Sequence, residues 1–303
     1  MKNQTLIVSI FAAIVIIGGA YAFTHSKTNP PEGAGMIIQS HHTYSLKSDS
    51  AGKTYSVNTP NEYSFSIVDE NGNMLKDFQL THTKVLHLIV VRKDLAYFQH
   101  VHPEFDPATG MFTIKDLTFP VDGQYRIFAD FAATGGQMDA MGMPLTTVDS
   151  EDVAVGNVAN YSPQQIGTEE TTKTFDGMTA KLATHGTLTS GADNILMFNL
   201  SVNGKPVTDL QPYLGALGHA VVLREGNLDY IHAHPIEDVT AKQSGTVSFM
   251  VDFPEAGTYK IFTQFQRNGK VITTDFVVTV VQGSTNSSGT TEGTQMNMPD
   301  MTH

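Results

Sequence analysis

Three histidines recur with the same spacing at two places in a chain that has only 12 histidines. At each place one histidine is followed, at the same interval in both copies, by a His-x-His pair and then a proline. Neutral imidazole is the commonest metal ligand in proteins, and three rings on one rigid face with a fourth position open suit copper or zinc. The two sets are His87, His100 and His102, and His219, His232 and His234.

The first set is expected on one face of a β-hairpin. A two-residue turn at Lys93–Asp94 would place His87 directly opposite His100, with about 5 Å between their Cβ atoms. Side chains alternate along a strand, so His102 falls on the same face. Pro103, and Pro235 in the second copy, are expected to end the strand and to leave the His-x-His pair near the rim of the sheet, where an ion can enter.

The second set allows two hairpin registers. A turn at Glu225–Gly226 pairs His219 with His232, whereas a turn at Gly226–Asn227 pairs His219 with His234. Both registers keep the three histidines on one face. The sequence therefore predicts one three-histidine site in each copy.

The two predicted sites differ at a fourth position. His82 lies just before the first hairpin and is a candidate fourth ligand, but its counterpart in the second copy is Leu214. The alternative is a structural role, since a single histidine on a half-buried strand commonly bonds to the backbone. Three histidines on one face, present in both copies, favour a metal, because burying three imidazoles without a ligand would leave polar groups unsatisfied.

Methionines are concentrated in two short polar segments, QMDAMGMP and MNMPDMTH. Thioethers bind Cu(I) but have little affinity for zinc or calcium, so these segments favour copper, with zinc as the alternative metal. Surface methionines without a role are the other interpretation. The candidate ligands in these segments are Met138, Met141, Met143, Met296, Met298, Met301 and His303.

The elements that must position these residues are β-strands. Val, Ile, Tyr, Phe and Thr dominate short runs that are separated by turn signals such as Val202–Lys205 and Arg267–Lys270. The runs that begin at His87 and Phe119 recur at His219 and Phe253 with nearly the same offset, which indicates a duplication. We therefore predict an all-β protein with two tandem immunoglobulin-like β-sandwich domains after an N-terminal hydrophobic leader helix.

The composition sets the expected boundaries of these domains. The apolar run 6–23 ends in an Ala-x-Ala pattern, so it is expected to be either a cleaved signal peptide or an uncleaved membrane anchor. The last residues are rich in Gly, Ser, Thr and Asn, which is typical of disorder. The expected division is a leader at 1–23, a linker at 24–52, the first β-sandwich at 53–156, a linker at 157–176, the second β-sandwich at 177–281 and a disordered Met/His tail at 282–303.

Composition also excludes several classes of function. The net charge is −12 and no dense basic patch is visible, which argues against a nucleic-acid partner. The absence of cysteine excludes thiolate zinc sites, iron–sulfur clusters and blue-copper centres. The leader predicts an exported, extracytoplasmic protein, either secreted or anchored, whose only contact with a membrane is through the N-terminal segment.

The pattern HLIVVRKDLAYFQHVHP followed by FPVDGQYRIFADF is similar to exported bacterial proteins with tandem YtkA-like and CopC-like immunoglobulin-type modules. The resemblance covers roughly 63–131 and 197–280. It implies a β-sandwich fold and extracytoplasmic metal handling, and it implies no known reaction. The match to CopC proper is weak, because the first residue of the mature chain would not be the histidine that serves that family as a ligand. The residues that match the motif are His82, His87, His100 and His102, then His219, His232 and His234.

Three functions are compatible with these features. The first is sequestration or transfer of copper, with the metal ion and another extracytoplasmic copper-handling protein as partners. The second is a structural or adhesive pair of immunoglobulin-like domains without metal. The third is a metal-dependent enzyme, which ranks last because Glu104 follows the first His-x-His-Pro whereas Ile236 follows the second, and because no phosphate-binding loop or G-x-S-x-G motif is present. No catalytic residue is therefore assigned.

Overall fold

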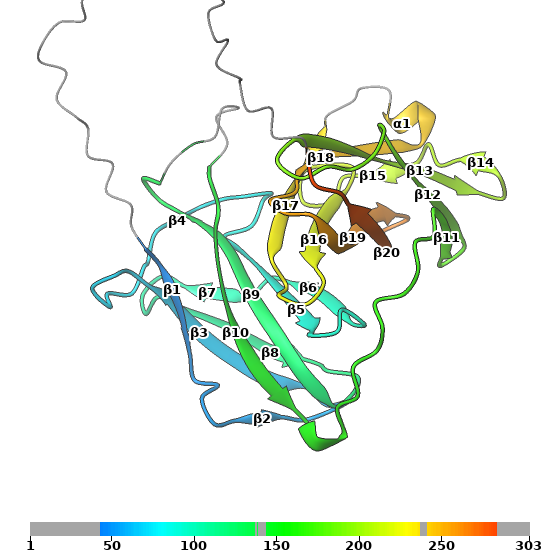
Figure 1. Ribbon diagram of the computed structural model, residues 1–303. Helices are drawn as coiled ribbons and strands as arrows, with labels where there is room; N and C mark the ends of the chain where they lie inside the picture. Colours follow the sequence, from blue (N-terminus) through cyan, green and yellow to red (C-terminus); the bar gives the residue numbers. More distant parts are fainter. Residues whose placement is uncertain (1–42, 137, 139–143, 237–240, 284–303) are drawn as a thin grey trace, which may run out of the picture. The chain divides into compact units, whose positions relative to one another are not determined.

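The computed structural model describes residues 43–136, 138, 144–236 and 241–283 (Figure 1). The predicted all-β fold of two tandem β-sandwich repeats is confirmed. Within the described ranges the helical elements are single turns, the 3-10 turn η1 (Val158–Asn160) and the helix α1 (Ala241–Ser244). None of the helices in these ranges has the length and apolar character needed to cross a membrane. The predicted leader and the Met/His tail lie outside the described residues, apart from 282 and 283.

The first repeat consists of two sheets. One has the strand order β1-β3-β8-β7, and the other has the order β2-β10-β9-β5-β6 with β4 paired to β9. The strands are β1 (Ser45–Ser48), β2 (Thr54–Tyr55), β3 (Asn61–Val68), β4 (Phe78–Gln79), β5 (Leu86–Arg92), β6 (Phe98–Val101), β7 (Glu104–Asp106), β8 (Met111–Leu117), β9 (Gly123–Ala133) and β10 (Thr147–Val155).

The second repeat follows the same plan, with its strands joined in the order β11-β12-β13-β18-β17-β16-β19-β15, β14 beside β13 and β20 beside β19. β17 pairs first with β16 and then, from His234 onward, with β18, so Pro235 does not end the strand as expected. The strands are β11 (Thr172–Phe175), β12 (Met178–Thr184), β13 (Asp193–Val202), β14 (Lys205–Pro206), β15 (Leu210–Gln211), β16 (His219–Arg224), β17 (Tyr230–Ile236), β18 (Thr246–Asp252), β19 (Gly257–Arg267) and β20 (Lys270–Val280).

Both sandwiches begin earlier than the sequence pattern indicated. β1 lies within the stretch 24–52 that was expected to be a linker, and it pairs with β3 while Leu46 joins the buried core. β11 lies within the expected linker 157–176, where it pairs with β12 and Phe175 packs against the second core. Short polar strands of this kind contribute one apolar side chain each, which is too weak a signal to separate them from a linker.

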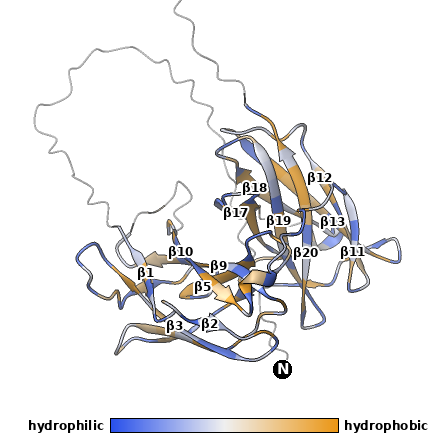
Figure 2. Ribbon diagram, turned by 60° about the horizontal axis from the view of Figure 1, so that its bottom comes forward, coloured by the Kyte–Doolittle hydropathy of each residue, from blue (hydrophilic) through white to orange (hydrophobic). Residues whose placement is uncertain are grey.

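The central hairpin strands are buried on both faces. Along β5, Leu88 and Val90 enter the core of the first sandwich, whereas Ile89 and Val91 point to the opposite face and join a separate apolar cluster. Figure 2 shows most of β5 as orange ribbon, the colour of hydrophobic residues. A strand covered on both faces reads as a continuous apolar run, and β5 is buried along its whole length.

The cluster that covers the second face of β5 is shared by the two repeats. We call it the inter-repeat cluster. Burying a side chain of this size stabilises a fold by roughly 1.5–3 kcal/mol, so eight of them make a substantial interface. Its buried members are Ile89, Val91, Leu95 and Phe128 from the first repeat and Val221, Leu223, Leu228 and Phe262 from the second.

The aromatic contacts in this cluster are reciprocal. Phe98 of the first repeat stacks on Phe262 of the second, with 4.4 Å between ring centroids. Phe128 of the first repeat packs on Tyr230 of the second at 5.3 Å. In the duplication Phe98 corresponds to Tyr230 and Phe128 to Phe262, so the same pair of positions meets twice with the roles exchanged. The two repeats therefore pack through the same face of each hairpin.

Candidate metal centre

The first hairpin has a wider turn than predicted. Ile89 is opposite His100, so the predicted pairing of His87 with His100 is wrong by two residues. The Arg92 N–H donates to the Tyr97 carbonyl at 3.1 Å, which leaves a four-residue turn. Leu95 in this turn has φ +60° and is buried in the inter-repeat cluster, and burying it needs the longer turn. A shift of two residues keeps every side chain on its predicted face.

The second hairpin adopts one of its two predicted registers. Ala220 is opposite Ala233, which is the pairing expected for a turn centred on Gly226–Asn227. On the backbone, His232 lies opposite Val221. The side chains of His232 and His234 lie outside the described part of the structure, so their part in a site stays a prediction.

Three buried histidines from both repeats converge. One ring nitrogen each from His87, His100 and His219 lies within 4.8 Å of the others, and the three side chains are 1%, 9% and 4% exposed. The sequence pattern assigned His219 to a separate site in the second repeat. His219 instead joins the first repeat's histidines, because it lies on the same face of β16 as Val221, which is the face that packs against the first repeat.

Two further rings of the first repeat border this trio. The half-buried His102 places its Nε2 3.1 Å from Nδ1 of His87. His82 is also half-buried, and the centroid of its ring lies 5.2 Å from that of His219. We refer to His82, His87, His100, His102 and His219 as the histidine cluster.

His82 sits on a strained turn. Its φ is +47° and that of the following Thr83 is +70°, a conformation that is rare for a β-branched residue. The matching turn of the second repeat has Leu214 at +55° and Gly215 at +87°, so the turn is the same but lacks the imidazole. The sequence-based correspondence of His82 with Leu214 agrees with this geometry.

A hydrogen bond fixes the proton of the His87 ring, and the orientation of the Gln264 amide assigns that of His100. Nε2 of His87 lies 2.9 Å from the Thr81 carbonyl, which can only accept, so Nε2 carries the hydrogen and the lone pair of the neutral ring is on Nδ1. Nδ1 of His100 lies 2.8 Å from Oε1 of Gln264. The amide nitrogen of Gln264 donates to Thr273 Oγ1 at 3.2 Å, and in this orientation Oε1 accepts from His100. The lone pair of His100 is then on Nε2.

These two lone pairs face each other. Nδ1 of His87 and Nε2 of His100 are 2.9 Å apart. With the hydrogens placed in this way the two nitrogens do not donate to each other, and a bound metal ion could accept both lone pairs. Burial, followed by the neighbouring His87, lowers the pKa of His100 to about 3, and burial lowers the pKa of His102 to about 3, so an additional proton is disfavoured at neutral pH. Nitrogens bound to one tetrahedral zinc ion lie about 3.3 Å apart, so the donor set fits an ion.

A buried carboxylate adjoins the cluster. Asp130 on β9 is opposite His87 on β5 and is 1% exposed. Its Oδ2 accepts a hydrogen bond from the Tyr230 hydroxyl at 2.9 Å. Burial, with the nearby Asp130, raises the pKa of Tyr230 well above its usual value, so the phenol stays a donor. The negative charge of Asp130 favours a cation beside it.

The residues that surround the histidines were missed at the sequence level. Asp130 and Gln264 occupy the same position in the two copies, between the two phenylalanines of the motifs Phe-Ala-Asp-Phe and Phe-Thr-Gln-Phe. A polar residue between two core aromatic residues on a strand could have indicated that Asp130 and Gln264 are buried and functional. The contact of His87 with the Thr81 carbonyl could not be predicted from the sequence, because every residue has a backbone carbonyl.

The predicted methionine ligands are mostly outside the described residues. Met138 is 54% exposed and forms a β-bridge with Pro144. Met141, Met143, Met296, Met298, Met301 and His303 lie outside the described ranges. Glu104, the carboxylate considered for an enzyme, is exposed and pairs in the other sheet, on β7.

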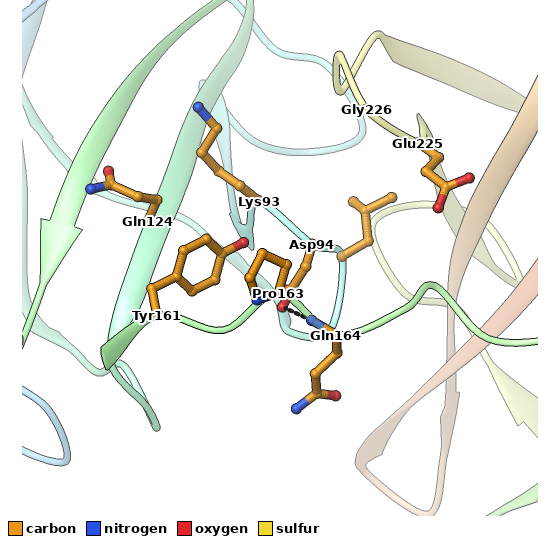
Figure 3. A pocket seen from close by; sticks show the side chains of 9 residues that line it. Lys93, Asp94, Gln124, Tyr161, Pro163, Gln164, Glu225 and Gly226 are labelled. Carbon is orange, nitrogen blue, oxygen red and sulfur yellow. Dashed lines mark hydrogen bonds between the residues drawn. The ribbon is translucent and has the colours of Figure 1, made fainter. Parts of the chain in front are cut away.

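A pocket of about 400 Å³ lies where the linker passes the two hairpin turns (Figure 3). The Gln164 N–H donates to Oδ2 of Asp94 at 2.9 Å, and Arg92 lies over the ring of Tyr161 at 4.9 Å. These contacts tie the linker to the first hairpin. The pocket offers no cluster of metal-binding side chains among its described lining residues and lies beside the turns, so the histidine cluster is the better candidate site.

One family matches both copies of the repeat. The match is to "Domain of unknown function (DUF8832)", at residues 40–148 and again at 172–282. The chain belongs to this family. The second match starts after the first by the same offset that separates His219 from His87, in agreement with the predicted duplication. The DUF8832 description assigns no activity, and no protein with a curated description matches the chain.

Similar solved structures include a surface layer protein and fibronectin(III)-like modules. The S-layer protein SbsC, domains 4–9, is 12% identical with a TM-score of 0.23, and the match covers 79% of this chain and 31% of that one. InvD of Yersinia pseudotuberculosis is 13% identical with a TM-score of 0.25, covering 82% and 60%. The fibronectin(III)-like modules of Clostridium thermocellum CbhA are 12% identical with a TM-score of 0.21, covering 78% and 94%.

The chain spans less than two thirds of the SbsC and InvD structures. Identities and TM-scores this low carry no argument about function.

Proposed function

We propose that this protein binds a transition-metal ion, copper or alternatively zinc, in the histidine cluster between its two repeats, and sequesters it or passes it on outside the cytoplasm. The observation that carries the proposal is the pair of opposed ring nitrogens, Nδ1 of His87 and Nε2 of His100, 2.9 Å apart in a buried site. His219 belongs to the same group, in which one ring nitrogen from each of the three histidines lies within 4.8 Å of the others. A cation bound among these rings would be ligated by three nitrogens.

The choice of copper rests on the methionine segments and the N-terminal leader in the sequence. Thioethers on a surface loop or tail can bring Cu(I) to imidazoles, whereas they add little for zinc. The apolar segment 6–23 supports export, and the resemblance to YtkA-like and CopC-like modules supports copper handling. The partner would be another extracytoplasmic copper-handling protein. The proposal is for binding and transfer and includes no catalytic step.

Thermal unfolding tests the proposal. The purified chain would be melted without metal and with Zn²⁺, Cu⁺ or Cu²⁺. Free metal at a hundred times Kd stabilises by about 2.7 kcal/mol, which raises Tm by roughly 5–10 °C for domains of this size. The matched control is His185→Ala, which removes an exposed histidine of the second repeat and is expected to keep the full shift. No shift in the wild-type protein with any of these ions would refute the proposal.

A second candidate function is structural. The hydrogen bond from His100 to Gln264 would also help to join the two sandwiches with no ion bound, and the one from His87 to Thr81 would order the first sandwich. Exchanging the oxygen and nitrogen of the Gln264 amide would supply the missing proton, because His100 could then donate from Nε2 to His87. In that case the protein would be a rigid pair of immunoglobulin-like domains, and the melting experiment would show no effect of metal.

A further inference from the structure

We infer that Gln264 of the second repeat is a positioning residue, which holds His100 of the first repeat in the tautomer that presents Nε2 to the ion. The inference rests on the proposed function. Gln264 contacts the ligand from the other repeat, so the first repeat alone would lack the group that orients its own histidine.

The contact is short and enclosed. Oε1 of Gln264 lies 2.8 Å from Nδ1 of His100, and the two side chains are 6% and 9% exposed. Such exclusion of water leaves few competing acceptors for the Nδ1 hydrogen. Metal-binding histidines almost always donate their second ring nitrogen to a carboxylate, a carbonyl or a water, and an amide oxygen serves the same purpose.

Packing of the two repeats sets this contact. Phe98 and His100 are two residues apart on β6, and Phe262 and Gln264 are two residues apart on β19. The rings of Phe98 and Phe262 stack at 4.4 Å. The aromatic pair and the His100–Gln264 pair are therefore consecutive contacts between the same two strands, and the first fixes the register of the second.

The opposite pairing follows the same plan. Asp130, the counterpart of Gln264, accepts the hydroxyl hydrogen of Tyr230, the counterpart of Phe98. Each repeat thus places a hydrogen-bond acceptor against the hairpin of the other. At this position the first repeat has a carboxylate, which accepts but cannot donate, and this supports the acceptor role of Gln264.

Two substitutions separate positioning from packing. Gln264→Glu can only accept from His100, and we expect it to bind Zn²⁺ with the wild-type affinity or up to about tenfold tighter. Gln264→Leu keeps the size but removes the acceptor, and we expect it to bind Zn²⁺ about 10–100-fold more weakly, as is usual for loss of such a partner. Affinities would be measured by chelator competition in the full chain, and both metal-free variants would be melted to verify folding.

A proton readout makes the test independent of metal. Long-range ¹H–¹⁵N spectra of the imidazoles in the metal-free protein report which nitrogen carries the hydrogen. We expect Nδ1–H for His100 in the wild type and in Gln264→Glu, and loss of this single tautomer in Gln264→Leu. Nε2–H in the wild type, or wild-type Zn²⁺ affinity in Gln264→Leu, would overturn the inference. A wild-type chain that shows Nδ1–H but binds no metal would refute the proposed function and leave the positioning role standing.

Discussion

The strongest prediction concerns a pair of histidines from different repeats. If His87 and His219 bind the same ion, the effects of His87→Ala and His219→Ala on metal affinity must be strongly non-additive. The chain offers one donor from each to a group whose nitrogens lie within 4.8 Å of one another. Two independent sites, as the spacing of the histidines first indicated, would give effects that simply add.

The magnitude follows from the number of ligands. Structural zinc sites with four ligands bind with about 10–16 kcal/mol, so one ligand accounts for about 2.5–4 kcal/mol. Each single variant should therefore lose about 3 kcal/mol, or roughly 150-fold in Kd. The double variant should lose little more than either single variant, because the loss of one of the three buried donors already breaks up the site and only His100 of the three then remains. The expected coupling energy is about 2–3 kcal/mol.

Chelator competition with Zn²⁺ at neutral pH measures all four affinities, and His185→Ala serves as the control. Metal content per chain is determined on the same samples. The reasoning is refuted if the coupling energy is near zero, or if each single variant loses one of two bound ions and keeps the other at wild-type affinity.

Phe262→Ala removes the ring that stacks on Phe98 and should cost about 3–5 kcal/mol in urea unfolding, with weaker Zn²⁺ binding because the ligands of the two repeats separate. The pKa values of His100 and His102 are lowered to about 3, below the unfolded value near 6.5. Between pH 3 and pH 6.5 the unfolded chain therefore binds more protons than the folded one. The free energy of unfolding of the metal-free protein should be full above pH 6.5 and fall toward pH 3, by at most about 1.4 kcal/mol per pH unit for each histidine. A flat profile in urea unfolding over this range would contradict the prediction. Asp130→Asn removes the buried charge opposite His87 and should weaken Zn²⁺ binding about tenfold in the competition assay, whereas an unchanged Kd would show that this charge does not act on the ion.

The fold was largely predictable because it follows from local patterns. Strand alternation and the repeat of the His87 and Phe119 runs were enough to indicate two β-sandwiches. The register of the first hairpin could not be predicted. The length of its turn depends on Leu95, which is buried only because the second repeat packs against it. The residue types at Lys93–Asp94 favour a two-residue turn by local preference. Burial of the neighbouring Leu95 against the second repeat outweighs that preference and lengthens the turn.

The sharing of the site was also beyond the sequence, although one signal pointed toward it. The run LHLIVVR of β5 is apolar at almost every position, which indicates that both of its faces are covered. It does not say by what. Strand alternation was enough to place His87 on the same face of its hairpin as His100. It could not show which residues lie near His219, because these depend on the surface of the first repeat that packs against β16.

The reciprocal packing of the repeats resembles an interface between identical subunits, where every residue must occur on both sides of the axis. Joining the halves in one chain removes that obligation. In this chain the equivalent positions of the two repeats have diverged. His82 in the first repeat corresponds to Leu214 in the second, and Asp130 corresponds to Gln264. An ion bound in the histidine cluster, as proposed, would meet unequal neighbours on its two sides, whereas an ion on the axis of a symmetric dimer would meet equal ones.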